Sequence, residues 1–388
     1  MFQKKSLILQ KITRPNTHYM LKLLIKQYIK YPTVFLGGFL KSFFLKEKRM
    51  EDPIDFVVTW VNGSDPVWKA EKLKYEGKDA ESTGDSSDER YRNWDLFRYW
   101  FRAVEQYAPW VNKVYLVTYG HIPSWLNTEC KKLVIVNHKD YIPAKYLPTF
   151  SSVPIELNLF RIKDLSEHFV YFNDDTILNS PVNPEDFFQD GLPRICSIAT
   201  PAQNSPNNEV FAHQLFTGFG FMNKYNWEDI IQKTSSKWFH HSYGVRLLYN
   251  WHAYQNRFFT GMYFTHMPQA FRKQTMKAVW EEFGKELDEI SSHRFRSPMD
   301  CNHHIFTMKE VVNGSYVPMK PFYYGRIDEL MAEHAETFAG NIRQKSCRII
   351  CVNDTKSINS KNFEPVRNTI EQAFREVLPT PSSFEKEN

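Results

Sequence analysis

Hydrophobic positions along the chain form either short continuous runs or stripes at helical spacing. The continuous runs are rich in β-branched and aromatic residues and cover 54–61, 113–118, 133–137, 168–172 and 348–352. Helical stripes separate them, for example Leu96, Trp100 and Val104 within the segment 93–107. Because strands alternate with helices in this order, the pattern predicts an α/β fold with a mostly parallel sheet.

The middle of the chain differs from this alternation, since about 205–320 is dominated by helical patterns and aromatic residues. Helices are predicted there at 226–235, 242–257, 268–289 and 302–313, with two more outside it at 154–165 and 365–377. The polar segment 76–90 predicts a loop. We therefore interpret 51–388 as one body with a helix-rich insertion at about 205–320, preceded by a separate segment, 1–50.

Charge sets the first 50 residues apart from the body. The chain has a net charge of +5, but residues 1–50 contain eleven Lys or Arg and one acid and sum to +10, so the remaining 338 residues sum to −5. Lys22, Lys26 and Lys30 share one helix face among apolar neighbours, and Gly37-Gly38 predicts a break. We expect a helix lying in an anionic membrane surface; the alternative is a helix packed on the body with its lysines in water. The mildly acidic body does not fit nucleic-acid binding.

Cysteine usage and the lack of a signal-peptide pattern predict the compartment. Five widely scattered cysteines, an odd number, do not suggest a disulfide framework, and we expect reduced thiols. The longest uncharged stretch near the N-terminus, Tyr31 to Leu40, is about half the length needed to span a bilayer. These features predict a cytoplasmic protein held peripherally on the inner face of the cell membrane.

Clustered polar residues follow three of the predicted strands. They are Asn62-Gly63-Ser64-Asp65, Asn173-Asp174-Asp175 and Asn353-Asp354. Ligands of open α/β sheets bind beyond the carboxyl ends of the strands, and paired carboxylates there can hold Mg²⁺ or Mn²⁺. The alternative for each cluster is a solvated turn.

Cationic side chains and one histidine are further candidates. Arg98 and Arg102 lie one helical turn apart and either contact a diphosphate or join a salt-bridge network. His266 stands in an apolar stretch, where a histidine is either a satisfied core residue or a catalytic group. Arg294 and Arg296 either bind phosphate or brace neighbouring helices.

Four blocks of residues, in order, resemble the Stealth family of capsular polysaccharide phosphotransferases, which includes the catalytic subunit of the lysosomal-enzyme N-acetylglucosamine-1-phosphotransferase. The blocks are Ile54-Asp55 with Thr59 through Pro66; Arg98 through Asp175, including Leu147 through Ser152 and Ile155-Glu156; Thr265 through Pro268 with Phe295 through Ser297; and Cys351 through Asp354 with Pro379 through Glu385. The resemblance covers most of 54–385 and leaves the first 50 residues outside. It implies a core like that of the nucleotide-diphosphosugar transferases, of GT-A or Rossmann-like type.

The resemblance also implies a reaction: transfer of a sugar 1-phosphate from a nucleotide sugar, UDP-N-acetylhexosamine or UDP-hexose, to a hydroxyl of a polysaccharide or lipid-linked glycan. With Mg²⁺ or Mn²⁺ as cofactor, we expect metal ligands at Asp174, Asp175 and Asp354. We expect His266 as the general base, with Arg296 and Asp175 as its catalytic partners. Donor-binding residues would be Asn62, Gly63, Asp65, Arg98, Arg102, Asn173 and Asn353. The rival interpretations are a glycosyltransferase that releases nucleoside diphosphate, and a non-catalytic peripheral membrane component of a polysaccharide assembly complex.

Overall fold

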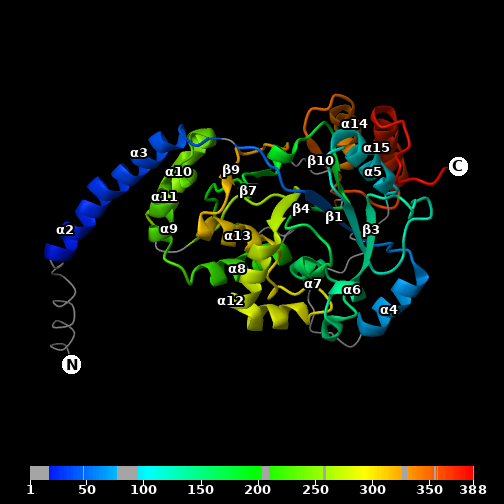
Figure 1. Ribbon diagram of the computed structural model, residues 1–388, viewed down its shortest axis with the longest axis horizontal. Coiled ribbons are helices and arrows are strands. Elements are labelled where there is room, and N and C mark those ends of the chain that lie inside the picture. The colour runs from blue at the N-terminus through cyan, green and yellow to red at the C-terminus, as the bar shows by residue number, and fades with distance from the viewer. Residues whose placement is uncertain are drawn as a thin grey trace.

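A five-stranded sheet forms the centre of the protein, as a computed structural model shows (Figure 1). The structure describes residues 17–46, 48–76, 94–202, 209–256, 259–325, 330–353, 355 and 357–387. The sheet has the order β3-β2-β1-β4-β8, with β1 (Ile54–Trp60), β2 (Val114–Thr118), β3 (Leu133–Asn137), β4 (His168–Asn173) and β8 (Gln269–Arg272). The first four strands are parallel and only β8 is antiparallel. The predicted α/β class with a mostly parallel sheet is therefore confirmed.

Helices cover both faces of this sheet, which explains why its strands are apolar on both sides. Phe56 and Val58 pack into one hydrophobic cluster, and Val57, between them, packs into another. The first cluster contains side chains of α5 (Phe97–Tyr107), α14 (Ala335–Arg343) and α15 (Phe363–Val377). The second contains side chains of α7 (Ser152–Leu157), α12 (Lys273–Ser291) and α13 (His304–Asn313). The result is a three-layer helix–sheet–helix arrangement.

The strand β8 was not predicted from the sequence. Helical periodicity predicted a helix over 268–289, whereas Gln269–Arg272 is a strand and α12 begins at Lys273. The strand forms because its backbone pairs with the open edge of β4, with Gln269 opposite Tyr171. The helix-rich region 205–320 therefore also contributes one strand to the central sheet.

Two small sheets and several helices complete the body. The strand β5 (Thr176–Leu178) pairs antiparallel with β10 (Ile349–Cys351), and a second small sheet consists of β6 (Phe188–Gln189), β7 (Leu192–Ile195) and β9 (Val317–Pro318). The remaining α-helices of the body are α4 (Pro66–Glu76), α6 (His138–Tyr141), α8 (Glu209–Met222), α9 (Trp227–Lys233), α10 (Ser235–Trp238) and α11 (Leu247–Tyr254). The predicted helix 154–165 is wrong beyond Leu157, where α7 ends. All five cysteines are free, as expected.

The N-terminal segment forms one long rod that projects from the body (Figure 1). It comprises α2 (Thr17–Ile25), a π-helical turn η1 (Lys26–Lys30) and α3 (Tyr31–Ser42), and α3 packs on α10. The predicted break at Gly37-Gly38 is wrong, because α3 continues through both residues. Gly38 instead allows close packing: a Cβ there would lie 2.5 Å from the carbonyl oxygen of Ser235. Among the described residues, no helix combines the length and apolar character that a membrane crossing requires.

The two adjacent glycines should therefore respond oppositely to alanine. Gly38→Ala should lower the free energy of unfolding by about 1–3 kcal/mol, because a backbone carbonyl must move to admit the methyl group. Gly37→Ala meets nothing within 4 Å and should raise it by roughly 0.5–1 kcal/mol through helix propensity. Urea denaturation of both variants measures the difference. Equal effects of the two substitutions would show that α3 does not pack tightly on α10.

Candidate active site

Two of the polar strand ends predicted from the sequence lie side by side. The strands β1 and β4 are parallel neighbours, and Thr59 is paired with Asn173 at their carboxyl ends. Asp174 and Asp175 then form the tight turn that connects β4 to β5. The third polar cluster reaches the same place, because the backbone N–H of Val352 donates to the carbonyl oxygen of Asp175 at 2.8 Å. Asn353 follows directly, while Asp354 lies outside the described residues.

The acidic pair has the electrostatic character of a cation site. Asp174 is exposed to solvent at one side. The protein packed around its carboxyl, followed by the charge of Asp175, raises the pKa of Asp174 from 3.8 to about 7. Asp175 Oδ1 is buried and has no hydrogen-bond partner. Oxygen ligands of this kind suit Mg²⁺ or Mn²⁺, and a bound cation would satisfy Oδ1 and offset the repulsion between the two carboxylates.

His266 and Cys351 adjoin the acidic pair. One ligand atom each from Asp175, His266 and Cys351 lie within 4.8 Å of one another. Burial is the main reason that the pKa of the Cys351 thiol lies well above its usual value of 9.0, and the nearby Asp175 carboxylate adds to it. Mg²⁺ and Mn²⁺ prefer oxygen over sulfur ligands, so for such a cation this set would contribute the Asp175 carboxylate.

The unpredicted strand β8 explains where His266 lies. Because β8 runs antiparallel to β4, the residues that precede Gln269 are directed toward the carboxyl end of β4. His266 Nε2 consequently lies 3.1 Å from Asp175 Oδ2 and 3.2 Å from Asn173 Nδ2. The His266 side chain is partly exposed, and the protein around it would by itself lower its pKa; the carboxylates of Asp175 and Glu156 together outweigh this effect, and the net shift is upward. The structure therefore joins three of the predicted site residues, Asn173, Asp175 and His266.

Arg296 joins the same group from the segment that follows α12. Its Nη2 donates to the hydroxyl of Ser152, at the start of α7, over 3.3 Å. The positive charge of Arg296 lowers the pKa values of both Glu156 and His266, although other causes are larger in each case. Arg296 is therefore a cation close to both Glu156 and His266, while its contact with phosphate stays a prediction.

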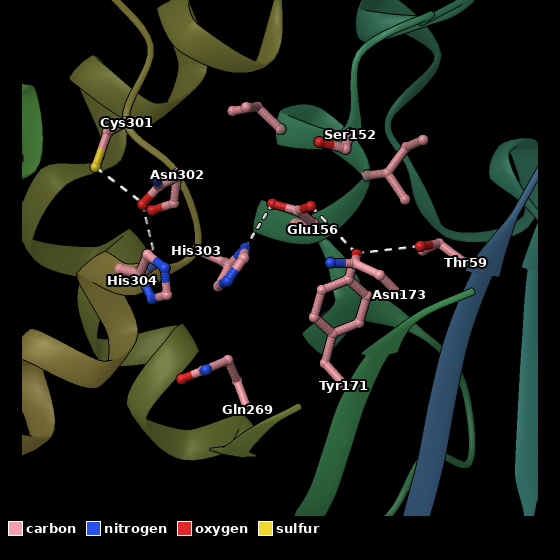
Figure 2. A network of polar contacts seen from close by, with 12 residues as sticks. Thr59, Ser152, Glu156, Tyr171, Asn173, Gln269, Cys301, Asn302, His303 and His304 are labelled. Carbon is pink, nitrogen blue, oxygen red and sulfur yellow. Dashed lines mark hydrogen bonds and ion pairs between the residues drawn. The ribbon is translucent and has the colours of Figure 1, made fainter. Parts of the chain in front are cut away.

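A polar network shown in Figure 2 includes Asn173 and extends to residues that the sequence interpretation did not assign to the site. The Tyr171 hydroxyl lies 3.1 Å from Thr59 Oγ1, 3.1 Å from Glu156 Oε1 and 2.8 Å from Asn173 Oδ1. On its other side, Glu156 Oε2 accepts a hydrogen bond from His303 Nδ1 at 2.7 Å. The network links His303, on the helical layer, to Asn173, at the strand end.

The electrostatics of this network centre on Glu156. Its side chain is buried, and burial would raise the pKa of its carboxyl. The positive charges of His303 and Arg296 outweigh that effect and hold the pKa below the usual 4.5. Glu156 therefore stays ionised. It is part of the second block of the family resemblance, and that block was the one sequence signal that could have identified it.

The residues predicted to line a nucleotide pocket form the turn after β1. The Asn62 backbone N–H donates to His121 Nε2 at 2.7 Å, and Asn62 Oδ1 accepts from the Ser64 N–H. Asp65 Oδ1 accepts the N–H of Trp68 and so caps the start of α4. Gly63 is buried between them. These contacts shape a rigid turn beside the acidic pair, while a role in nucleotide binding stays a prediction.

The two helical arginines lie apart from the joined residues. Arg102 forms a two-pronged pair with Glu385, at 2.7 and 2.8 Å, and also donates to the Leu378 carbonyl oxygen. Of the two interpretations of Arg102, the structure favours the salt bridge. Its guanidinium attaches the C-terminal segment to α5 and is not directed toward a diphosphate. Arg98 lies over the ring of Trp125 at 5.6 Å.

A small hollow of about 50 Å³, open to solvent, lies beside the segment that carries His266. Thr265 and Met267, the two neighbours of His266, both line it. The aromatic side chains of Tyr263, Phe322 and Tyr323 form another part of its wall. The hollow therefore presents aromatic surface beside the backbone segment on either side of His266.

The chain contains conserved regions of a known protein family. It matches three conserved regions of the Stealth proteins: Stealth protein CR1, conserved region 1, over 52–80; CR2, conserved region 2, over 90–195; and CR3, conserved region 3, over 265–304. These regions contain the acidic pair Asp174 and Asp175, and they also contain Glu156, His266 and Arg296. The class indicated by these matches is thus that of the Stealth proteins.

Full-length relatives identify the family. The chain is 40% identical over 346 residues to a capsular polysaccharide phosphotransferase, WcwK, of Streptococcus pneumoniae. This match covers 87% of this chain and 100% of the relative. It is 38% identical to a receptor polysaccharide phosphotransferase, WefC, of Streptococcus oralis (86% and 99% covered) and 33% identical to an exopolysaccharide phosphotransferase, cps2G, of Lactiplantibacillus plantarum (86% and 96%). The chain belongs to the Stealth family of polysaccharide phosphotransferases.

Among solved structures, the chain is similar to the apo form of WbbM, a bifunctional glycosyltransferase. The TM-score is 0.35 at 9% sequence identity, and the match covers 85% of this chain and 50% of the other.

Proposed function

We propose that this protein transfers a sugar 1-phosphate from a nucleotide sugar to a glycan hydroxyl during capsular or cell-surface polysaccharide synthesis. The observation that carries the proposal is the convergence of Asp174, Asp175, His266 and Arg296 at the carboxyl ends of β1 and β4 in a Stealth-family chain. Acids, a base and a cation side by side are what phosphoryl transfer needs, since its catalysis consists of positioning and of neutralising charge.

Asp174 and Asp175 would hold the divalent cation, Mg²⁺ or Mn²⁺, with Asn353 close by. When bound, the cation would neutralise negative charge on the diphosphate of the donor. The two oxygens of Asp175 would have different partners. Oδ1, which has no hydrogen-bond partner, is available to the cation, and Oδ2 faces His266. Asp354 is proposed as a further ligand on its sequence position alone.

His266 is proposed as the general base. Its Nε2–H would donate to Asp175 Oδ2, and Nδ1, which lies 3.5 Å from Asn173 Nδ2, would take the proton of the acceptor hydroxyl. The acceptor oxygen forms a bond to the phosphorus that carries the sugar, and the bond from that phosphorus to the bridging oxygen of the diphosphate breaks. Nucleoside monophosphate leaves with the bridging oxygen, and Arg296 stabilises the charge that gathers on the transferred phosphate.

The two substrates would approach from different sides. We place the nucleotide, as UDP, at the rigid turn of Asn62, Gly63 and Asp65 after β1, since nucleotides bind beyond the carboxyl ends of parallel strands. For the acceptor glycan, polymeric or lipid-linked, we propose the aromatic hollow beside His266, because aromatic rings provide apolar surface for sugar rings and a small set of polar groups orients them.

The proposal is tested by incubating the purified protein with a panel of nucleotide sugars, Mg²⁺ and an acceptor glycan, and by identifying the nucleotide that is released. We expect nucleoside monophosphate, formed only when both acceptor and divalent cation are present. Release of nucleoside diphosphate would instead show glycosyl transfer, and full turnover in the presence of EDTA would exclude the proposed metal.

A further inference from the structure

The N-terminal rod exposes an apolar stripe that the body does not cover. Its members are 47–82% exposed and are Leu21, Ile25, Ile29, Leu36, Leu40 and Phe44. Within each half of the rod they follow one another at four-residue spacing and so share one side of it, with Phe44 just beyond the end of α3. The exposed side chains of Leu23, Leu24 and Tyr28 extend this apolar surface around the outer half of the rod. Single exposed apolar residues are ordinary, but a contiguous stripe of this length marks an interaction surface.

The opposite side of the rod is the one that contacts the body. Tyr31, Gly38 and Ser42 are buried there, and the ring of Tyr31 packs edge-on against Tyr254 with 4.7 Å between centroids. Phe35 packs in the same way on Phe239, at 5.0 Å. The stripe therefore does not belong to the core, and the docking of α3 keeps it directed away from the body.

Lysine contacts correct the interpretation drawn from sequence. Lys26 and Lys30 both form salt bridges with Glu228, on α9 of the body, so they are not directed at a membrane. Between residues 17 and 46 the sequence contains no Asp or Glu and five lysines. Glu228 supplies one negative charge to Lys26 and Lys30 together, while Lys22 and Lys41 are exposed. The remaining charge of the rod is therefore positive.

We propose that the rod lies in the surface of an anionic lipid bilayer. The stripe from Leu21 to Phe44 enters the acyl-chain boundary, and Lys22 and Lys41 contact lipid phosphates. The charge favours lipid over a second copy of this chain: pairing two stripes would bring the exposed lysines of both copies together, whereas an anionic surface satisfies the stripe and the lysines at once. Through its contacts with Glu228 and Tyr254, the rod would hold the catalytic body at a fixed angle to the membrane. This inference is independent of the proposed reaction.

Flotation of the full chain with lipid vesicles tests it. We expect binding to vesicles that contain phosphatidylglycerol, and weaker, salt-insensitive binding to pure phosphatidylcholine. The double variant Ile29→Gln, Leu40→Gln should reduce partitioning about tenfold or more, because two large apolar side chains are lost from the interface. The variant Lys22→Gln, Lys41→Gln should weaken binding to anionic vesicles by roughly fivefold for each lysine and leave binding to phosphatidylcholine unchanged.

The matched control is Val67→Gln, Leu73→Gln, which replaces two equally exposed apolar residues on α4 and should bind vesicles like the wild type. Thermal melting by circular dichroism confirms that each variant is folded. Failure of the wild-type chain to float with anionic vesicles would overturn the inference, as would equal binding by the stripe variant and the control. If the wild-type chain does not bind vesicles but is a dimer in light scattering, and the stripe variant is a monomer, the stripe instead binds a second copy of this chain.

Discussion

Replacing Asp175 with asparagine is expected to reduce turnover by at least about 10³-fold without harming the fold. Asp175 Oδ1 is buried without a donor, and its charge helps to raise the pKa of Asp174. Removing that charge relieves the repulsion of Asp174 but also weakens the contact with His266, so the melting temperature of the variant should stay close to that of the wild type. A loss of activity together with unchanged stability is the signature of a site residue.

Metal binding gives this prediction a second readout. Mg²⁺ should raise the melting temperature of the wild type, because a ligand that binds only the folded state stabilises it, and should have no effect on Asp175→Asn. The matched control is Asp190→Asn, an exposed acid paired with Lys48. Asparagine tolerates its positive φ of 52°. If Asp175→Asn keeps wild-type turnover, or responds to Mg²⁺ as the wild type does, the proposed metal site is wrong.

The second large effect is expected for Glu156→Gln. Glutamine keeps the shape of the side chain but presents an N–H₂ group to His303 Nδ1–H or to the Tyr171 hydroxyl, and it removes the negative charge near Arg296. Disturbing the buried network should displace Asn173 and Arg296 and lower turnover roughly 10²-fold or more. Steady-state kinetics with both substrates measures the loss.

Stability of the same variant depends on pH in a defined direction. Because the pKa of Glu156 is lowered in the folded protein, its ionised form stabilises the fold above the usual pKa of 4.5, and this contribution is lost as pH falls through the folded value. Glu156→Gln should therefore be less stable than the wild type at neutral pH, and the difference should shrink in acid. Thermal melting over a pH series measures it.

Glu310→Gln is the matched control for Glu156→Gln. Glu310 is also a buried carboxylate, but it pairs with Arg272 and Thr275 away from the strand-end acids. Its loss should lower the melting temperature and leave the turnover of the folded enzyme nearly unchanged. If both variants lose stability and activity in the same proportion, Glu156 has only a structural role.

The sequence predicted the parallel strands and the acidic turn because both are local signals. An apolar run such as 168–172, directly followed by Asn173-Asp174-Asp175, specifies a buried strand and its polar end without reference to the rest of the chain. The meeting of the β1 and β4 ends followed from their being parallel strands, and their register confirms it.

Long-range pairing could not be predicted in this way. The residues 269–272 carry no strand pattern of their own, and the edge of β4 makes them a strand. That pairing, in turn, brings His266 to Asp175. For the same reason a single acid in an apolar helix, such as Glu156, gave no local signal, since its partner His303 lies 147 residues away. Arg102 shows the same limit: helical spacing left a diphosphate contact and a salt-bridge network both open, and the distant partner Glu385 decides for the salt bridge.

The most direct test of the proposed reaction follows the phosphate itself. A nucleotide sugar is prepared with radioactive phosphorus only in the phosphate bonded to the sugar, and is incubated with the protein, Mg²⁺ and an acceptor glycan. Sugar 1-phosphate transfer predicts that the label enters the glycan and that the released nucleoside monophosphate is unlabelled. Label found in a released nucleoside diphosphate, with an unlabelled glycan product, would contradict the proposed reaction.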